Sequence, residues 1–382
     1  MLRKISVVLL VATVTASAGS ASQNNQRFEA KVQQKMADHQ LPGLAVAHIK
    51  AGEVVYSNTF GFREVESETR LDQNTVMYGA SLTKFMFATF VMQLVNEGKI
   101  DLDVSIAQLL PKPLPEYERF ADLEGDERWK QLTLRILLSH LTGFPNFRFF
   151  PPTGEFDPDG KLEFLFDPGY RYGYSGEGYY IAQLVIEEAL NIKTRDQFYS
   201  RFFEPLGMTR TDLIWQDRFR PNFAQGYTAE GVNEGHNMQS NARAAGSMDT
   251  TLSDYSAWVA AYIHGDLLDA ETREEQLTAV MPITSRHQFP PWDTTPGSAH
   301  KTVGLGAGVG IKVFNGLKGP GFFHGGHNEK TDNLLLCLVE TQECVIFLMN
   351  TAKGHLVFPQ LVNELLGDTG LPWSWHFSGL AE

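Results

Sequence analysis

Apolar residues gather in two strand-like blocks, one near each end of the chain. Near the start, the apolar runs 44–49 and 54–60 stand on either side of Gly52 and predict an antiparallel hairpin. Near the other end, Gly-rich or polar turns separate further strand candidates at 303–314, 321–324, 333–339 and 345–349. A closing helix is predicted over 358–366, where Gly367 ends it.

The middle of the chain has a different pattern. Helical spacing or helix-start residues occur at 82–97, 134–138, 179–190, 195–203 and 252–263. The predicted fold class is therefore α/β (α+β): an antiparallel sheet built from both chain ends and flanked by helices, with a mainly helical second lobe. We expect one domain over 27–382, with a sheet lobe of 27–80 plus 301–382, a helical lobe of 81–300, and a ligand cleft between them.

The first 21 residues have the layout of a secretory signal peptide. Arg3 and Lys4 precede a short apolar stretch, and small residues place cleavage after Ala18 or Ala21. We expect an exported protein, periplasmic or secreted, with no stable membrane span in the mature chain; a retained anchor is the alternative.

Charge argues against one class of partner. The whole chain has a net charge of -13, and loss of Arg3 and Lys4 with the leader leaves 30 basic against 45 acidic residues, or -15. A nucleic-acid partner is therefore not expected.

Two cysteines, Cys337 and Cys344, stand in neighbouring apolar runs that resemble a strand pair. A turn at 340–341 would make them face each other, whereas a turn at 341–342 would not. We favour two free buried thiols, because cysteine is a common core residue.

Ser81 and Lys84 are the first candidates for chemistry. Ser81 opens the helix predicted over 82–97, and a spacing of three residues would place the Lys84 amine beside its hydroxyl. A serine hydroxyl is a weak nucleophile, and a desolvated lysine can lose its proton and act as the base. The structural alternative for Ser81 is a helix N-cap.

Two later segments supply further candidates. Tyr174 lies in a tyrosine-rich loop before a helix and could carry a proton to the leaving group if nearby positive charge lowers its pKa. His324, Gly326 and His327 follow at a strand end, where glycines let the backbone approach a ligand. His324 would contact substrate, and the N–H groups of His327 and Ser81 would form an oxyanion hole.

These motifs, in this order, resemble the serine β-lactamase and penicillin-binding protein superfamily, in the branch of class C β-lactamases, D-specific peptidases and family VIII esterases. Further landmarks in family order are 137–143, 205–208, 245–248 and 303–306. By this resemblance Ser81 is the nucleophile, Lys84 its lysine and Tyr174 the tyrosine of the Tyr-x-Asn element.

Two departures from the family pattern bear on substrate choice. Gly176 stands where asparagine is usual, and His324 stands where a lysine often engages a carboxylate. The resemblance therefore implies a serine hydrolase without cofactor or metal, acting on a small-molecule or peptide-like ester or amide. The alternatives are a β-lactamase or DD-carboxypeptidase, and a catalytically silent binding or scaffold protein with the same fold.

Two other enzyme classes are less consistent with the sequence. The run 173–177 nearly spells an α/β-hydrolase nucleophile elbow, but its last position is Glu177. His324, His327 and Glu329 suggest a metal hydrolase, yet no His-Glu-x-x-His helix occurs.

Overall fold

The computed structural model describes residues 14–150, 152 and 155–377. Its main feature is one large antiparallel sheet. The strands are β1 (Gly43–Lys50), β2 (Glu53–Glu64), β3 (Thr69–Arg70), β8 (Met281–Pro282), β9 (Gly306–Ala307), β10 (Lys312–Gly316), β11 (Gly319–Asn328), β12 (Thr331–Leu338) and β13 (Glu343–Met349). Short two-stranded pairs join β4 (Met77–Tyr78) to β7 (Asp249–Thr250) and β5 (Gly226–Tyr227) to β6 (Asn233–Gly235).

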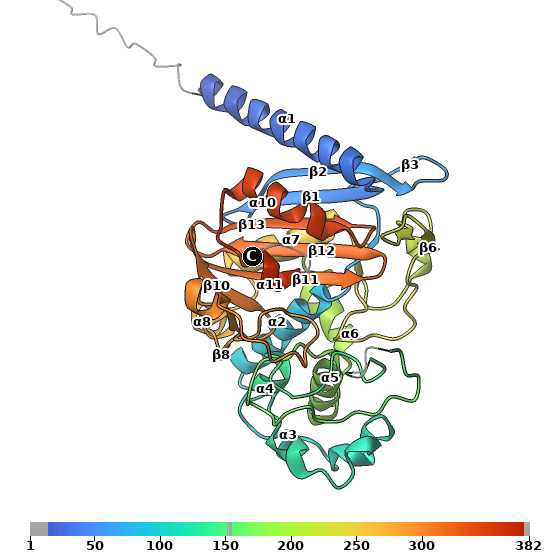
Figure 1. The fold of residues 1–382 in the computed structure, drawn as a ribbon, viewed down its shortest axis with the longest axis vertical. Coiled ribbons are helices and arrows are strands. Elements are labelled where there is room, and N and C mark those ends of the chain that lie inside the picture. The colour runs from blue at the N-terminus through green and yellow to red at the C-terminus, as the bar shows by residue number, and fades with distance from the viewer. Residues whose placement is uncertain (1–13, 151, 153–154, 378–382) are drawn as a thin grey trace, which may run out of the picture.

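The sheet brings the two ends of the chain together, in the order β3-β2-β1-β13-β12-β11-β10-β9-β8 (Figure 1). β1 pairs antiparallel with β13, so that Val46 lies opposite Phe347. The predicted fold class is therefore confirmed. β8, at the far edge, comes from the segment that the sequence assigned to the helical lobe.

Helices cover both faces of the sheet. The helices are α1 (Val14–His39), α2 (Leu82–Asn96), α3 (Ile106–Leu109), α4 (Leu134–Leu138), α5 (Gly176–Leu190), α6 (Thr194–Phe198), α7 (Leu252–His264), α8 (Ala270–Leu277), α9 (Ala299–Thr302), α10 (Phe358–Leu366) and α11 (Trp373–His376). On β1, Leu44 belongs to the same buried cluster as residues of α1 and α10, while Ala45 belongs to the cluster that contains residues of α2 and α7. A strand covered on both faces must be apolar throughout, which explains its unbroken apolar run.

α2 is the helix that places the predicted nucleophile. Nearly every side chain from Leu82 to Leu94 is buried, so the helix is apolar on all sides. A helix of that kind is stable only inside the protein. Its N-terminus, with Ser81, therefore lies in a rigid environment between the sheet and the second lobe, where α3, α4 and α5 lie (Figure 1).

Most of the predicted helices are found, with shifted ends. α5 begins at Gly176 instead of Tyr179, because the Ser175 hydroxyl accepts a hydrogen bond from the Gly178 N–H and caps the helix there. The helix predicted over 195–203 is α6 followed by a π-helical turn, Tyr199–Phe203.

The single strand predicted over 303–314 is wrong. Helix α9 ends at Thr302, and the segment then forms the short strands β9 and β10. Gly304 and Gly310 have φ of +59° and +78°, a conformation that interrupts a strand. At Gly310 a Cβ would lie 2.0 Å from that of Ala88, so the segment bends where it crosses α2.

The predicted leader lies mostly outside the described residues, which include only its last part, in α1. Among the described helices, none combines the length and the apolar character that a bilayer span requires.

The prediction of free thiols is wrong: Cys337 and Cys344 form a disulfide. They are directly opposite each other on β12 and β13, because the connection turns at 340–341. Both side chains are buried. The bond therefore ties together two central strands.

We expect the double variant Cys337→Ala/Cys344→Ala to lose about 2–3 kcal/mol in its free energy of unfolding, because the bond restricts a short loop of the unfolded chain. Urea denaturation measures the loss, and reduction of the wild-type protein should reproduce it. Recovery of alkylated thiols from the unreduced, denatured protein would contradict the disulfide.

Candidate active site

Ser81 and Lys84 lie side by side at the start of α2. Ser81 is the N-cap residue, but its side chain makes no capping hydrogen bond. The Nζ of Lys84 lies 3.0 Å from the Ser81 Oγ. The alternative in which Ser81 serves only as a cap therefore does not fit, and its hydroxyl is available to Lys84.

The amine of Lys84 is enclosed by protein. The residue is 0% exposed, and its Nζ also donates to the carbonyl oxygen of Ala245. Burial, assisted by the charge of Lys312, lowers the pKa of Lys84 well below its ordinary value. A neutral amine next to a serine hydroxyl can accept the hydroxyl proton. This role of Ala245, in the 245–248 landmark, was not predicted from the sequence.

Tyr174 joins this pair from the loop before α5. Its ring centroid lies 5.0 Å from the Lys84 Nζ, and its hydroxyl is hydrogen-bonded to Ser81. The proton-carrying role predicted for Tyr174 depends on nearby positive charge that lowers its pKa. Burial raises that pKa instead and outweighs the hydrogen bond to Ser81. The phenol therefore keeps its proton near neutral pH, which makes Lys84 the better candidate base.

His140 holds Tyr174 in place, a role the sequence analysis missed although the residue lies in the 137–143 landmark. The two rings pack with centroids 4.2 Å apart. His140 Nδ1 faces the backbone of Ser175, whose N–H lies 3.1 Å away and whose carbonyl oxygen lies 3.2 Å away, so this backbone fixes the orientation of the ring. Burial, followed by the charges of Lys84 and Lys312, lowers the pKa of His140, so the ring is neutral.

The end of β11 packs against the Ser81 loop. A Cβ on Gly326 would lie 2.5 Å from the carbonyl oxygen of Gly79, so only glycine allows this approach. His324 is buried beside Tyr174, with ring centroids 6.4 Å apart. Burial, then the charges of Lys312 and Lys84, lower its pKa, and its Nε2 has no hydrogen-bond partner among the described residues.

The side chain of His327 has a different environment. It is 59% exposed, and its Nδ1 lies 3.6 Å from Asp332. The imidazole is therefore directed to Asp332, and the oxyanion-hole role given to the His327 N–H stays a prediction.

Lys312 is a further member of the cluster that sequence reasoning missed. It lies on β10, is 1% exposed, and its Nζ has no hydrogen-bond partner in the described part of the chain. That nitrogen lies 5.5 Å from the Tyr174 ring centroid. A lysine amine is therefore present at this site, although His324 occupies the position where the family resemblance expects lysine. The available signal was a lysine between Ile311 and Val313 in an otherwise apolar strand.

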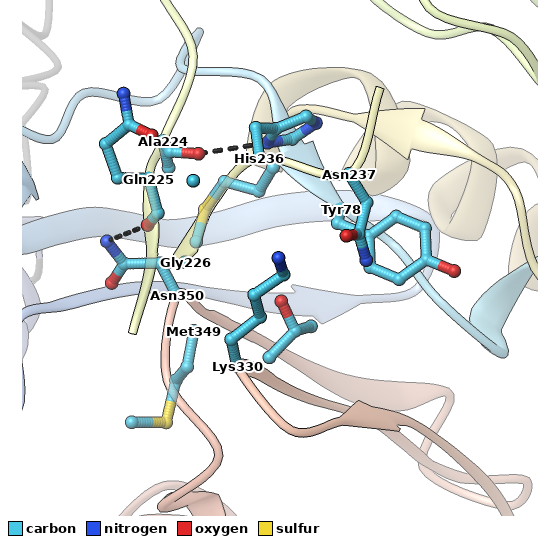
Figure 2. A pocket seen from close by; sticks show the side chains of 12 residues that line it. Tyr78, Ala224, Gln225, Gly226, His236, Asn237, Lys330, Met349 and Asn350 are labelled. Atoms are coloured by element: carbon cyan, nitrogen blue, oxygen red, sulfur yellow. Dashed lines mark hydrogen bonds between the residues drawn. The ribbon is translucent and has the colours of Figure 1, made fainter. Parts of the chain in front are cut away.

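A small pocket beside this cluster is not the candidate site. The centre of a water molecule can occupy a volume of only about 10 Å³ in this pocket, so the pocket has room for about one water. Figure 2 shows the side chains of Tyr78, His236 and Lys330 around it. None of Ser81, Lys84, Tyr174 and Lys312 lines it.

The metal-hydrolase alternative finds no ligand set in the described residues. There, no three His, Cys, Asp or Glu side chains form a group that could hold a metal ion, and His324, His327 and Glu329 do not converge.

The profile of the family described as Beta-lactamase matches residues 28–362. The chain belongs to the Beta-lactamase family. Among curated relatives, Unguisins hydrolase ungD of Aspergillus violaceofuscus is 26% identical over 272 residues, which cover 64% of this chain and 47% of that protein. The chain spans about half the length of the curated relatives it matches.

Two solved structures share the fold of this chain. The D-amino acid amidase of Ochrobactrum anthropi aligns with a TM-score of 0.69 and 20% identity over 90% of this chain and 98% of its own. A class C beta-lactamase aligns with a TM-score of 0.72 and 15% identity over 91% of this chain and 97% of its own. At these identities the similarity shows the fold alone.

Membership in the Beta-lactamase family also removes the α/β-hydrolase alternative. The serine of that elbow would be Ser175, whose hydroxyl donates to the carbonyl oxygen of Pro145 and caps α5. It is buried and already bonded, so it cannot serve as the nucleophile.

Gly176, the first departure from the Beta-lactamase family pattern, has a packing reason. A Cβ there would lie 2.8 Å from the Phe147 ring and 2.9 Å from the carbonyl oxygen of Asn146. The Asn146 side-chain oxygen also accepts a hydrogen bond from the Gly176 N–H over 3.0 Å. The loop at 146–147 thus occupies the space that the family's asparagine would need.

We expect Gly176→Asn to lower the free energy of unfolding by about 1–3 kcal/mol, because the added side chain overpacks this loop. The control is Gly98→Asn, at a helix end where a Cβ meets nothing within 4 Å and where asparagine suits the positive φ. Urea denaturation compares the two variants, and equal losses would contradict the packing argument.

Proposed function

We propose that this protein is a serine hydrolase that forms an acyl-enzyme on Ser81 from an ester or amide substrate. The observation that carries the proposal is the 3.0 Å approach of the buried Lys84 Nζ to the Ser81 Oγ. Nucleophile and base within hydrogen-bond reach are what acyl transfer requires.

In the proposed reaction, Lys84 as a neutral amine takes the Ser81 proton while the Oγ attacks the acyl carbonyl. The N–H groups of Ser81 and His327 would hold the oxyanion. The proton then passes through the Tyr174 phenol to the leaving alcohol or amine. Water next attacks the acyl ester, Lys84 takes the water proton and returns it to the Ser81 Oγ, and the acid leaves.

The names of two structural neighbours, a D-amino acid amidase and a class C beta-lactamase, support an amide or lactam substrate, and the relative named Unguisins hydrolase supports hydrolysis. We place this chain among the esterases and D-amino-acid amidase-like or peptidase-like enzymes, with β-lactamase or DD-carboxypeptidase as the second candidate. A silent binding protein would have no need of an uncapped, lysine-paired serine.

We further propose that the protein is exported to the periplasm or secreted. The leader-like pattern of residues 1–21 supports this, and so does the disulfide between Cys337 and Cys344, since structural disulfides persist in oxidising compartments.

We expect Ser81→Ala to reduce kcat for ester hydrolysis by roughly 10⁴-fold or more, with Lys84→Met comparable and the double variant no worse, because the two residues act as one unit. The free energy of unfolding of Ser81→Ala should change by less than about 0.5 kcal/mol, since the hydroxyl caps nothing. The matched control is exposed Ser200→Ala. Activity that survives in purified Ser81→Ala would overturn the proposal.

We expect a neutral p-nitrophenyl ester to have a higher kcat/KM than a cephalosporin. Gly176 offers no side-chain amide to orient an amide substrate, and an alkoxide leaves with less help from proton transfer than an amine. The replacement of the family's lysine by His324 also suggested weaker binding of a substrate carboxylate. That reason does not hold, because Lys312 places a lysine amine at the site. A cephalosporin preferred about tenfold, or 1.4 kcal/mol in the transition state, would contradict this expectation.

A further inference from the structure

Lys312 is a buried amine for which the proposed reaction has no use so far. Its side chain comes from β10, where it lies opposite Phe323 on β11, one residue before His324. The amine is buried, with no acceptor for its protons among the described residues. Burying an unpaired ammonium is unfavourable, so such a group is retained only if something else requires it.

Two lysines lie against the same aromatic ring. The Nζ atoms of Lys84 and Lys312 are 5.0 and 5.5 Å from the centroid of Tyr174. Because both distances are measured to the same ring centroid, the separation of the two nitrogens cannot exceed the sum of the two distances. Both amines are buried, so two positive charges at such a range repel each other more than they would in water.

The titratable groups around the two lysines provide no negative charge to offset that repulsion. Those that face Lys312 are Lys84 on α2, His140 after α4, Tyr174 before α5, His324 on β11 and His376 on α11. All are basic or neutral, and within the described residues no carboxylate acts on either lysine. The pair of lysines can therefore carry one proton-borne positive charge, whereas no negative charge offsets the repulsion that a second one would add.

We propose that Lys312 is a positioning residue that holds the one proton shared by the two lysines and so keeps Lys84 as the neutral amine that activates Ser81. The inference rests on the proposed function. A lysine can be activated by a second cation beside it in a desolvated site. Burial lowers the pKa of Lys312 to about 7, while burial and Lys312 together lower that of Lys84, and both shifts agree with this assignment.

The sign of the pH dependence follows. Lys84 is active when neutral, so the reactivity of Ser81 is present above the pKa of Lys84 and is lost as the pH falls through it. Removing the charge of Lys312 raises the pKa of Lys84. The acid limb of the pH profile must then move to higher pH, with the plateau at high pH unchanged.

The experiment measures the rate at which a neutral fluorophosphonate labels Ser81, as a function of pH. In this step the Ser81 Oγ–P bond forms, fluoride leaves and Lys84 takes the hydroxyl proton, so the rate reports activation of the nucleophile without turnover. For Lys312→Met we expect the midpoint of the acid limb to rise by about one pH unit or more, which is about tenfold slower labelling on the acid side.

The matched control is Lys330→Met, which removes another buried lysine whose Nζ donates to the carbonyl oxygen of Glu234. Its midpoint should stay at the wild-type value. The melting temperature of Lys312→Met should not fall, because an apolar side chain of similar length replaces an unpaired buried cation. Lys312→Gln is the second neutral variant, with the same expected shift.

An unchanged midpoint in Lys312→Met, or a rate lowered equally at every pH, would overturn the inference while Ser81 still labels. Unfolding of both Lys312 variants would assign the residue a structural role and overturn it as well. Absence of labelling at Ser81 in the wild-type protein is a different result, since it overturns the proposed function itself.

Discussion

An amine buried without a counter-charge is the interaction on which the site depends. Lys84 is enclosed at the first turn of a helix that is buried on nearly all sides, and the charge acting on it within the described chain is that of Lys312. Water would stabilise the ammonium form, and the protein interior does not. The protein therefore converts an ordinarily protonated side chain into a base, which a serine hydroxyl needs before it can attack an acyl group.

The fold supplies this environment from segments far apart in the chain. The pairing of β1 with β13 joins the two ends of the chain in one sheet. In this sheet the end of β11 lies against the Ser81 loop. The loop before α5 then adds Tyr174, and Ala245 accepts a hydrogen bond from the lysine. Each of these contacts comes from a different element. The packing of the core, which holds those elements together, therefore also fixes the geometry of the site.

The two departures from the family pattern have different physical meanings. Gly176 lacks a side chain because the loop at 146–147 fills that space, so an amide at this position is excluded by packing. His324 does not remove positive charge from the site, because Lys312 brings a lysine nitrogen to the Tyr174 ring from the neighbouring strand. At Gly176 a side-chain amide is lost, whereas at His324 the lysine is replaced by one on the neighbouring strand.

The sequence by itself determined the five long sheet strands β1, β2, β11, β12 and β13, the main helices and the proximity of Ser81 to Lys84, because these depend on local periodicity and on a spacing within one helical turn. Tertiary structure alone decided the rest. The Cys337–Cys344 bond follows from strand register, the raised pKa of Tyr174 from burial, and the place of Lys312 from the order of two neighbouring strands. Register, desolvation and strand order are relations between distant segments, and no local pattern of residues encodes them.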